Sequence, residues 1–131
     1  MGDRPDVPDW MLERLRAAAT ALPECREESA WIGHRWRVGQ ATVAHIFGGE
    51  DELFRITLRG DPDDVAAFTH LGSPYFKSDW GSNVIGMLVD EDTDWDEVGE
   101  LLAISYCIQA PRHLAERVDP QSAPDPKSPQ A

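Results

Sequence analysis

Residues 92–106 read DTDWDEVGELLAISY and form the most clearly signalled element of this chain. Asp94 has the side chain of a good N-cap, and Glu97 follows three residues later at the spacing of a capping box. The acids of this first turn also suit the positive end of a helix dipole. The apolar residues that follow recur at helical spacing: Val98, Leu101, Leu102 and Ile108. The segment therefore predicts an amphipathic helix from Asp94 to about Ala110.

Two further helices are indicated upstream. Asp61 is predicted to cap a helix that has Pro62 at its first position and two more acids in its first turn. This helix is expected to end at Gly72. Pro8 fits the first turn of an earlier helix that runs to about Leu22. The residues expected to face the core in these two helices are Met11, Leu12, Leu15, Ala18, Ala19, Leu22, Val65, Phe68 and Leu71. Pro111 then kinks the last helix or begins a short one through Val118.

Between these helices the pattern changes to strands. The predicted strands are Trp31–Val38, Ala41–Phe47, Leu53–Arg59 and Val84–Val89. Glu24 to Ala30 is interpreted as a charged connection, and extra strand pairing is possible near Tyr75–Lys77. The order α-β-β-β-α-β-α predicts an α+β domain in which helices cover one face of a mainly antiparallel sheet.

The length of 131 residues suits one domain. Residues 1–7 are expected to be a flexible leader, residues 8–118 the domain, and residues 119–131 a disordered tail rich in proline. Nothing resembles a signal peptide or a membrane span. Cys25 and Cys107 have no metal-type spacing and are interpreted as reduced thiols, which favours a cytoplasmic protein.

The net charge of −12 argues against strong non-specific binding to nucleic acid and against an anionic membrane. The charge is segregated, however. Residues 79–100 hold eight acids and no Lys or Arg, whereas the predicted strands carry Arg35, Arg37, Arg55 and Arg59. Because side chains alternate along a strand with a period of two, Arg35 and Arg37 share a face, and so do Arg55 and Arg59. The sheet could therefore present a local positive patch. The alternative is that these are ordinary solvent-facing side chains.

A loop at residues 73–83 offers aromatic rings beside one cation, Lys77. Such rings can stack the bases of an unpaired strand, although they can equally cover the end of a core. Trp80 is the tryptophan expected to be exposed. Trp36 should face inward, opposite Arg35 and Arg37, while the others fit packing positions: Trp10, Trp31 and Trp95.

Catalytic and metal-binding patterns are absent from the sequence. His34 and His45 could meet across the first hairpin, but two ligands without a third do not make a metal site. No nucleophile motif, phosphate-binding loop or dinucleotide fingerprint occurs. Ser105 and Tyr106 are interpreted as contacts of the long helix. The expectation is a protein that is not an enzyme and has no cofactor.

Several segments together resemble the MmcQ/YjbR family over roughly residues 8–118. The matching pieces are Leu22-Pro23, Glu27-Glu28, Arg37-Val38-Gly39, Ala44, Asp61-Pro62, Trp80-Gly81, and Asp94-Trp95 through Ser105-Tyr106. The resemblance implies a small α/β domain similar to secretion-chaperone and frataxin-like folds. It also implies DNA binding, which is ascribed to the family from a double-wing shape with sheet hairpins as wings. The family usually has a lysine after the Val-Gly turn, where this chain has Gln40-Ala41-Thr42.

Two functions remain open at this point. The first is a module that binds DNA or single-stranded nucleic acid through Arg35, Arg37, Arg55, Arg59, Lys77 and Trp80. The second is an acidic protein-interaction or adaptor module, with the aromatic loop and the acidic helix start facing a basic partner. A small-molecule pocket between the sheet and the long helix is a third reading.

Overall fold

The computed structural model describes residues 5–78, 81 and 83–118. Its helices are α1 (Asp9–Ala19), α2 (Pro62–Leu71), α3 (Trp95–Gln109) and α4 (Arg112–Ala115). Its strands are β1 (Arg26–Ser29), β2 (His34–Val38), β3 (Ala41–Gly48), β4 (Phe54–Arg59), β5 (Tyr75–Lys77) and β6 (Val84–Val89). The expected tail at residues 119–131 and the first part of the expected leader lie outside the described residues.

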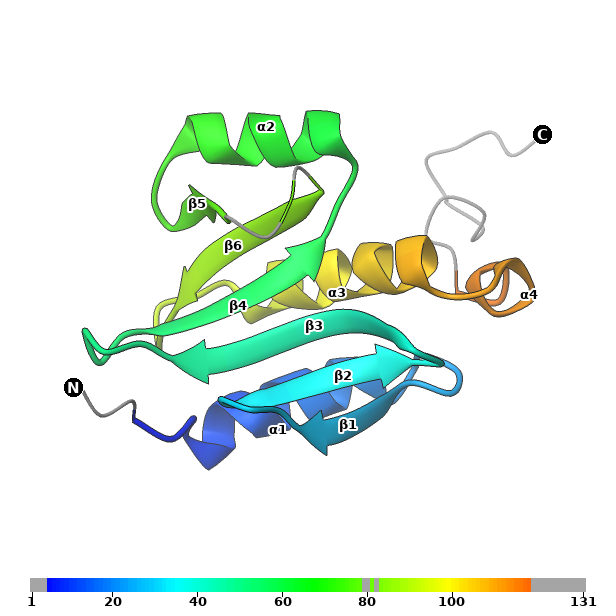
Figure 1. Cartoon of the computed structure of the whole chain (residues 1–131), viewed down its shortest axis with the longest axis horizontal. Coiled ribbons are helices and arrows are strands. Elements are labelled where there is room, and N and C mark those ends of the chain that lie inside the picture. Colours follow the sequence, from blue (N-terminus) through cyan, green and yellow to red (C-terminus); the bar gives the residue numbers. More distant parts are fainter. Residues whose placement is uncertain (1–4, 79–80, 82, 119–131) are drawn as a thin grey trace.

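The strands form one antiparallel sheet in the order β1-β2-β3-β4-β6-β5 (Figure 1). In Figure 1 the sheet faces the viewer, and α1 and α3 pass behind it. The predicted α+β class with helices on one face is confirmed. The possible pairing near Tyr75–Lys77 is confirmed as well, because β5 pairs with β6.

The sequence interpretation missed β1, which was expected to be a connection. All four residues of β1 are polar, so no apolar alternation marks this strand. It lies at the edge of the sheet, where charged side chains are common because they discourage pairing with another chain. Glu28 and Glu27 of this strand reach arginines on β2 and α1 instead of a core. Ion pairing therefore stabilises a strand that carries no hydrophobic signal.

The core lies between the sheet and the helices. Trp36 is buried, as predicted, and its neighbours Arg35 and Arg37 point to the other face of β2. On β4, Ile56 and Leu58 are likewise buried and alternate with Arg55, Thr57 and Arg59, which point to the other face. From the helices the core receives Met11, Leu12, Leu15, Ala19, Val65, Val98, Leu101, Leu102 and Tyr106.

Both predicted caps are present. The Asp94 carboxylate accepts hydrogen bonds from the backbone N–H groups of Asp96 and Glu97. The Asp61 carboxylate accepts one from the N–H of Asp63, with Pro62 at the first helical position. These bonds satisfy N–H groups that have no partner inside a helix, so they fix where α2 and α3 begin.

The helix α3 is tied to the middle of the sheet by polar contacts as well as packing. The buried Ser105 hydroxyl donates to the carbonyl of Val43 on β3 and accepts from the backbone N–H of Arg59 at 2.8 Å. The Gln109 side-chain amide donates to the carbonyl of Thr42 at 2.8 Å. Ser105, interpreted from the sequence as a helix-surface or helix–sheet contact, is thus a helix–sheet contact. These bonds hold the ends of β3 and β4 together at the point where the candidate site lies.

Some expected core residues are not buried. Trp31 is 99% exposed, Leu71 is 71% exposed and Ile108 is 43% exposed. The predicted first strand began at Trp31, but β2 begins only at His34. At the N-terminus, Val7 belongs to the core, so the chain packs against the domain before the predicted boundary at residue 8.

Candidate functional site

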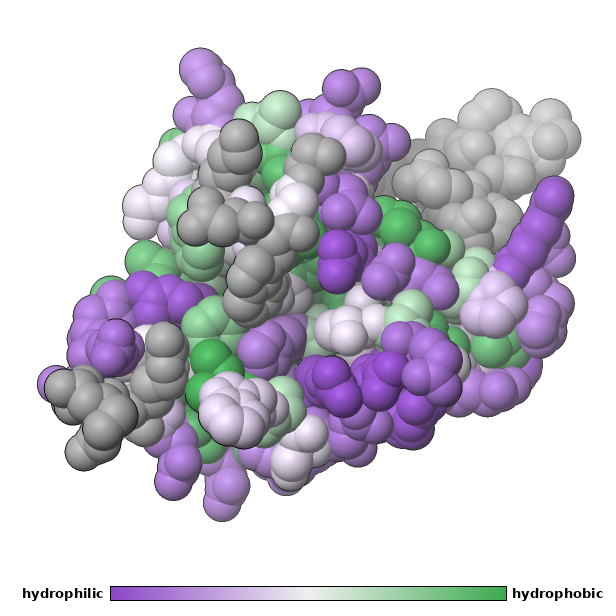
Figure 2. Space-filling model, in the orientation of Figure 1, coloured by the Kyte–Doolittle hydropathy of each residue, from purple (hydrophilic) through white to green (hydrophobic). Residues whose placement is uncertain are grey.

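The sheet face that the helices leave uncovered carries the arginines. Pairing aligns Arg35 with His45, and His45 with Thr57, so these three side chains share this face. The period of two places further residues on the same face, which we call the arginine face: Arg26, Arg35, Arg37, Arg55 and Arg59. Figure 2 shows this side, with hydrophilic side chains gathered over β1 and β2. The predicted arginines therefore all lie on one face.

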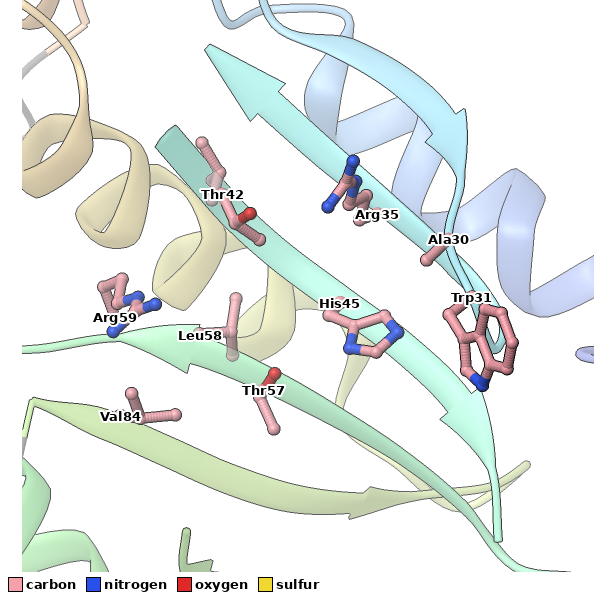
Figure 3. A pocket seen from close by; sticks show the side chains of 10 residues that line it. Ala30, Trp31, Arg35, Thr42, His45, Thr57, Leu58, Arg59 and Val84 are labelled. Atoms are coloured by element: carbon pink, nitrogen blue, oxygen red, sulfur yellow. The ribbon is translucent and has the colours of Figure 1, made fainter. Parts of the chain in front are cut away.

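A hollow of about 250 Å³ lies in the middle of this face (Figure 3). Arg35 and Arg59 stand on opposite sides of it, and His45 and Thr57 line the space between them. Its remaining lining residues are Ala30, Trp31, Thr42, Val43, Leu58 and Val84. Arg37 and Arg55 do not line the hollow. The structure thus divides the predicted arginines into two at the hollow and two beyond it.

Glu28 neutralises part of the charge on β1 and β2. Its carboxylate lies 2.7 Å from Nη2 of Arg35, 3.1 Å from Nη1 of Arg37 and 3.6 Å from Nε of Arg26. The guanidiniums of Arg37 and Arg35 hold the pKa of Glu28 below its usual range. Arg37 also donates to the carbonyl of Gln40 at 2.7 Å, so it braces the β2–β3 turn. Three guanidiniums around one carboxylate leave a local positive excess.

Arg55 forms an ion pair away from the hollow. Its Nη2 lies 2.6 Å from Oδ2 of Asp51 in the β3–β4 turn, and this ion pair holds the pKa of Asp51 well below its usual range. Gly49 leaves room for the Arg55 guanidinium, because a Cβ at position 49 would lie 1.8 Å from its Nη1. This ion pair stabilises the β3–β4 turn. The main role of Arg55 is therefore structural.

Arg59 has a neutral partner. Its Nη1 donates to the side-chain oxygen of Asn83 at 3.3 Å, a long hydrogen bond. No carboxylate of the described residues forms an ion pair with it. Its backbone is fixed by Ser105, as described above, so the guanidinium projects from a firmly held strand end. Arg59 is therefore the arginine of this face whose charge is least compensated.

His45 lies between the two arginines of the hollow. Its Nε2 donates to the carbonyl of Ile32 at 2.6 Å. Burial of the ring and the nearby charge of Arg35 lower the pKa of His45, although the bond to Ile32 opposes this. The possible meeting with His34 does not occur. His34 pairs with Ile46, the neighbour of His45 on β3, so the two rings point to opposite faces, and His34 Nδ1 lies 3.2 Å from Glu27.

Trp31 is the residue that the sequence interpretation misplaced. It stands at the tip of the β1–β2 connection, which is closed by a hydrogen bond from the N–H of Ala30 to the carbonyl of Gly33 at 3.1 Å. Gly33 has φ +71°, and a Cβ there would lie 1.9 Å from the carbonyl oxygen of Ile46, so only glycine fits. A glycine inside the predicted strand was the available signal of a break at this position. The turn thus presents the indole beside the hollow (Figure 3).

Two other predicted site residues are not placed. Trp80 lies outside the described residues, and only the backbone of Lys77, in β5, is described. In the described part of the chain, no three His, Cys, Asp or Glu side chains gather as a metal site requires. No described helix is long and apolar enough to cross a membrane.

The sequence was compared with models of known protein families and with solved structures. A family model described as YjbR matches residues 20–108, which include all of the strands and the arginine face. The chain belongs to the YjbR family. A solved structure with the same fold is that of Deinococcus radiodurans protein DR2400, a DUF419 domain, with a TM-score of 0.60 and 19% identity. The alignment covers 74% of this YjbR chain and 76% of that protein, and at this identity it speaks for the fold alone. A comparison with curated proteins gives no significant match.

Proposed function

We propose that this YjbR protein is a binding module that holds a strand of nucleic acid on the arginine face. The observation that carries the proposal is the exposed indole of Trp31 at a hollow that also contains Arg35 and Arg59. An aromatic ring and two guanidiniums match the two parts of a nucleotide, because a base stacks on the ring and phosphate oxygens accept from the guanidiniums.

The local charge supports an anionic ligand in spite of the net charge of −12. Five guanidiniums lie on this face, and the ion pairs to Glu28 and Asp51 compensate them only in part. Acids elsewhere on the chain are screened, since the Debye length is about 8 Å at physiological ionic strength. A phosphate at the hollow would therefore respond mainly to Arg35 and Arg59.

The geometry favours an unpaired strand over a duplex. A base can lie flat on Trp31 only if it is free of its partner, because the faces of paired bases are covered by their neighbours. None of the described helices projects from this face to enter a major groove. We therefore expect single-stranded DNA or RNA to bind more tightly than a duplex of the same length.

The proposed role is not enzymatic. The residues described around the hollow include one histidine and two threonines but no carboxylate, cysteine or serine. The Nε2–H of His45 is already donated to Ile32. We propose a cytoplasmic location, which the thiol form of both cysteines supports.

The experiment is fluorescence anisotropy with labelled single-stranded and double-stranded DNA, titrated with the full chain at low and at physiological salt. We expect saturable binding to the single strand, with a dissociation constant of about 10⁻⁵ M at low salt. If two or three phosphates are neutralised, the logarithm of affinity should fall with the logarithm of salt with a slope of about −2. Absence of binding to either DNA at low salt would refute the proposed function.

A further inference from the structure

On the opposite side of the molecule, the neighbouring helices α2 and α3 expose large aliphatic side chains. Leu71, at the end of α2, is 71% exposed, and Ile104 of α3 is 37% exposed. Both line a hollow between the two helices, and Leu71 belongs to the stripe that the sequence predicted to be buried.

These side chains border a groove. Two adjoining hollows of about 220 and about 450 Å³ share Phe68, Leu101 and Ile104, and we call them together the α2–α3 groove. Its apolar lining consists of Val65, Phe68, Leu71, Tyr75, Ile85, Leu101 and Ile104. The rings of Phe68 and Tyr75 pack at 4.8 Å, which gives the groove a firm aromatic wall. It is therefore an elongated apolar surface formed mainly by two helices.

The rim of the α2–α3 groove is acidic. Its described carboxylates are Asp64, Asp94, Asp96, Glu97 and Glu100, while Arg59 borders the inner end. Asp94 caps α3. None of the five forms an ion pair with another described residue. An apolar floor edged by carboxylates that have no ion pair among the described residues fits a ligand that is apolar on one side and cationic at its flanks.

We propose that the α2–α3 groove binds an amphipathic helix of a partner protein, with its apolar face in the groove and Lys or Arg on its flanks. Helices lie in such grooves through apolar anchors spaced at i, i+3, i+4 and i+7, which suits an elongated site. The charge rim selects a basic helix and disfavours nucleic acid. A second copy of this chain is disfavoured too, because it would bring two acidic rims together. This inference is independent of the proposed function of the arginine face.

The test uses a designed probe, a peptide of about 15 residues with Leu at the four anchor positions and Lys and Ala elsewhere. A scrambled peptide of the same composition, which lacks an apolar face, separates groove binding from general attraction to an acidic protein. Binding is measured by fluorescence anisotropy of the labelled peptides with the full chain. The helical probe should bind at least about 10-fold more tightly than the scrambled one.

Two matched variants locate the binding. Leu71→Ser with Ile104→Ser should weaken the helical probe about 10-fold or more, since both side chains border the groove. Leu53→Ser with Ile108→Ser removes two aliphatics that are 50% and 43% exposed but do not line it, and should leave binding unchanged. Glu97→Gln with Glu100→Gln should weaken binding in a way that disappears at high salt. Circular dichroism verifies that each variant is folded.

Three results would overturn the inference. Equal binding of helical and scrambled peptides would mean that only charge is recognised. Equal effects of the two aliphatic variants would place the peptide elsewhere. Sedimentation that shows a dimer of the parent chain, lost in Leu71→Ser with Ile104→Ser, would make the groove a contact between two copies.

Discussion

The arginine face and the α2–α3 groove lie on one small domain and have opposite chemistry. The first carries five guanidiniums and an indole that is 99% exposed. The second has an apolar floor and five carboxylates at its rim. The net charge of −12 describes neither surface. The comparison teaches that a ligand class should be judged from the charge within about one Debye length of a site, not from the sum over the chain.

The largest expected effect comes from removing the two arginines at the hollow. Arg35→Ala with Arg59→Ala should weaken single-stranded DNA about 100-fold at low salt, because hydrogen bonds to charged groups contribute about 1.5–3 kcal/mol each. The matched control is Arg112→Ala with Arg117→Ala, which removes the same charge from the region of α4, away from the face. Anisotropy titrations compare the two. Equal losses of DNA affinity in the two variants would show that binding depends only on the net charge of the protein. They would contradict the assignment of DNA binding to the arginine face.

Trp31→Ala tests whether a base of the nucleic acid stacks on the exposed indole. A base on an aromatic ring contributes about 1–3 kcal/mol, so we expect about 10-fold weaker binding to the single strand and little change for a duplex. The melting temperature should not change, because Trp31 is 99% exposed. Trp10→Ala is the control, since Trp10 packs edge-on against Trp95 on the helix-covered side. A Trp31→Ala protein that binds the single strand as the parent does would contradict a stacking role.

Glu28→Gln is expected to act in the opposite direction. It releases Arg35 and Arg37 from their carboxylate partner, and surface ion pairs contribute up to about 1 kcal/mol, so DNA binding should tighten about 3-fold. Glu97→Gln with Glu100→Gln removes more negative charge at the α2–α3 groove and should leave DNA binding at physiological salt nearly unchanged. Tighter binding in the groove variant alone would reverse the assignment of the surfaces.

The smallest effect concerns pH. Because the pKa of His45 is lowered in the folded protein, the unfolded chain takes up the proton first as the pH falls. The free energy of unfolding should therefore fall as the pH drops below the ordinary histidine value. A further loss follows below the carboxylate range, since Glu27, Glu28 and Asp51 also have lowered pKa values. Urea titrations at several pH values test this.

The control for this pH effect is the variant His45→Gln, which should flatten the first part of the decline. A parent protein whose stability is constant between neutral pH and pH 5 would contradict the assigned environment of His45.

Much of the fold follows from local patterns in the sequence. The caps at Asp61 and Asp94 and the alternation of β4 were predictable, because each depends on residues a few positions apart. The strand β1 was not, since its stability comes from ion pairs to α1 and β2 that only the tertiary structure brings together.

The candidate site was predictable in part. The arginines follow from the period of two, but the hollow depends on the register that aligns Arg35, His45 and Thr57. Trp31 was expected to pack, because an indole is usually buried; Gly33 and the close approach of Ile46 turn it outward. Leu71 was expected in the buried stripe of α2 but is 71% exposed, because helical spacing does not show where the covering element ends.

The most direct test of the two-surface account is one NMR experiment on the ¹⁵N-labelled full chain. An unlabelled oligothymidine is added first, and the helical Lys/Leu probe peptide is then added to a separate sample. The account predicts that the DNA shifts the Trp31 indole and the backbone amides around Arg35, His45 and Thr57, while the peptide shifts residues around Phe68, Leu71 and Ile104. Shifts from both ligands at the same residues, or DNA shifts confined to α2 and α3, would contradict it.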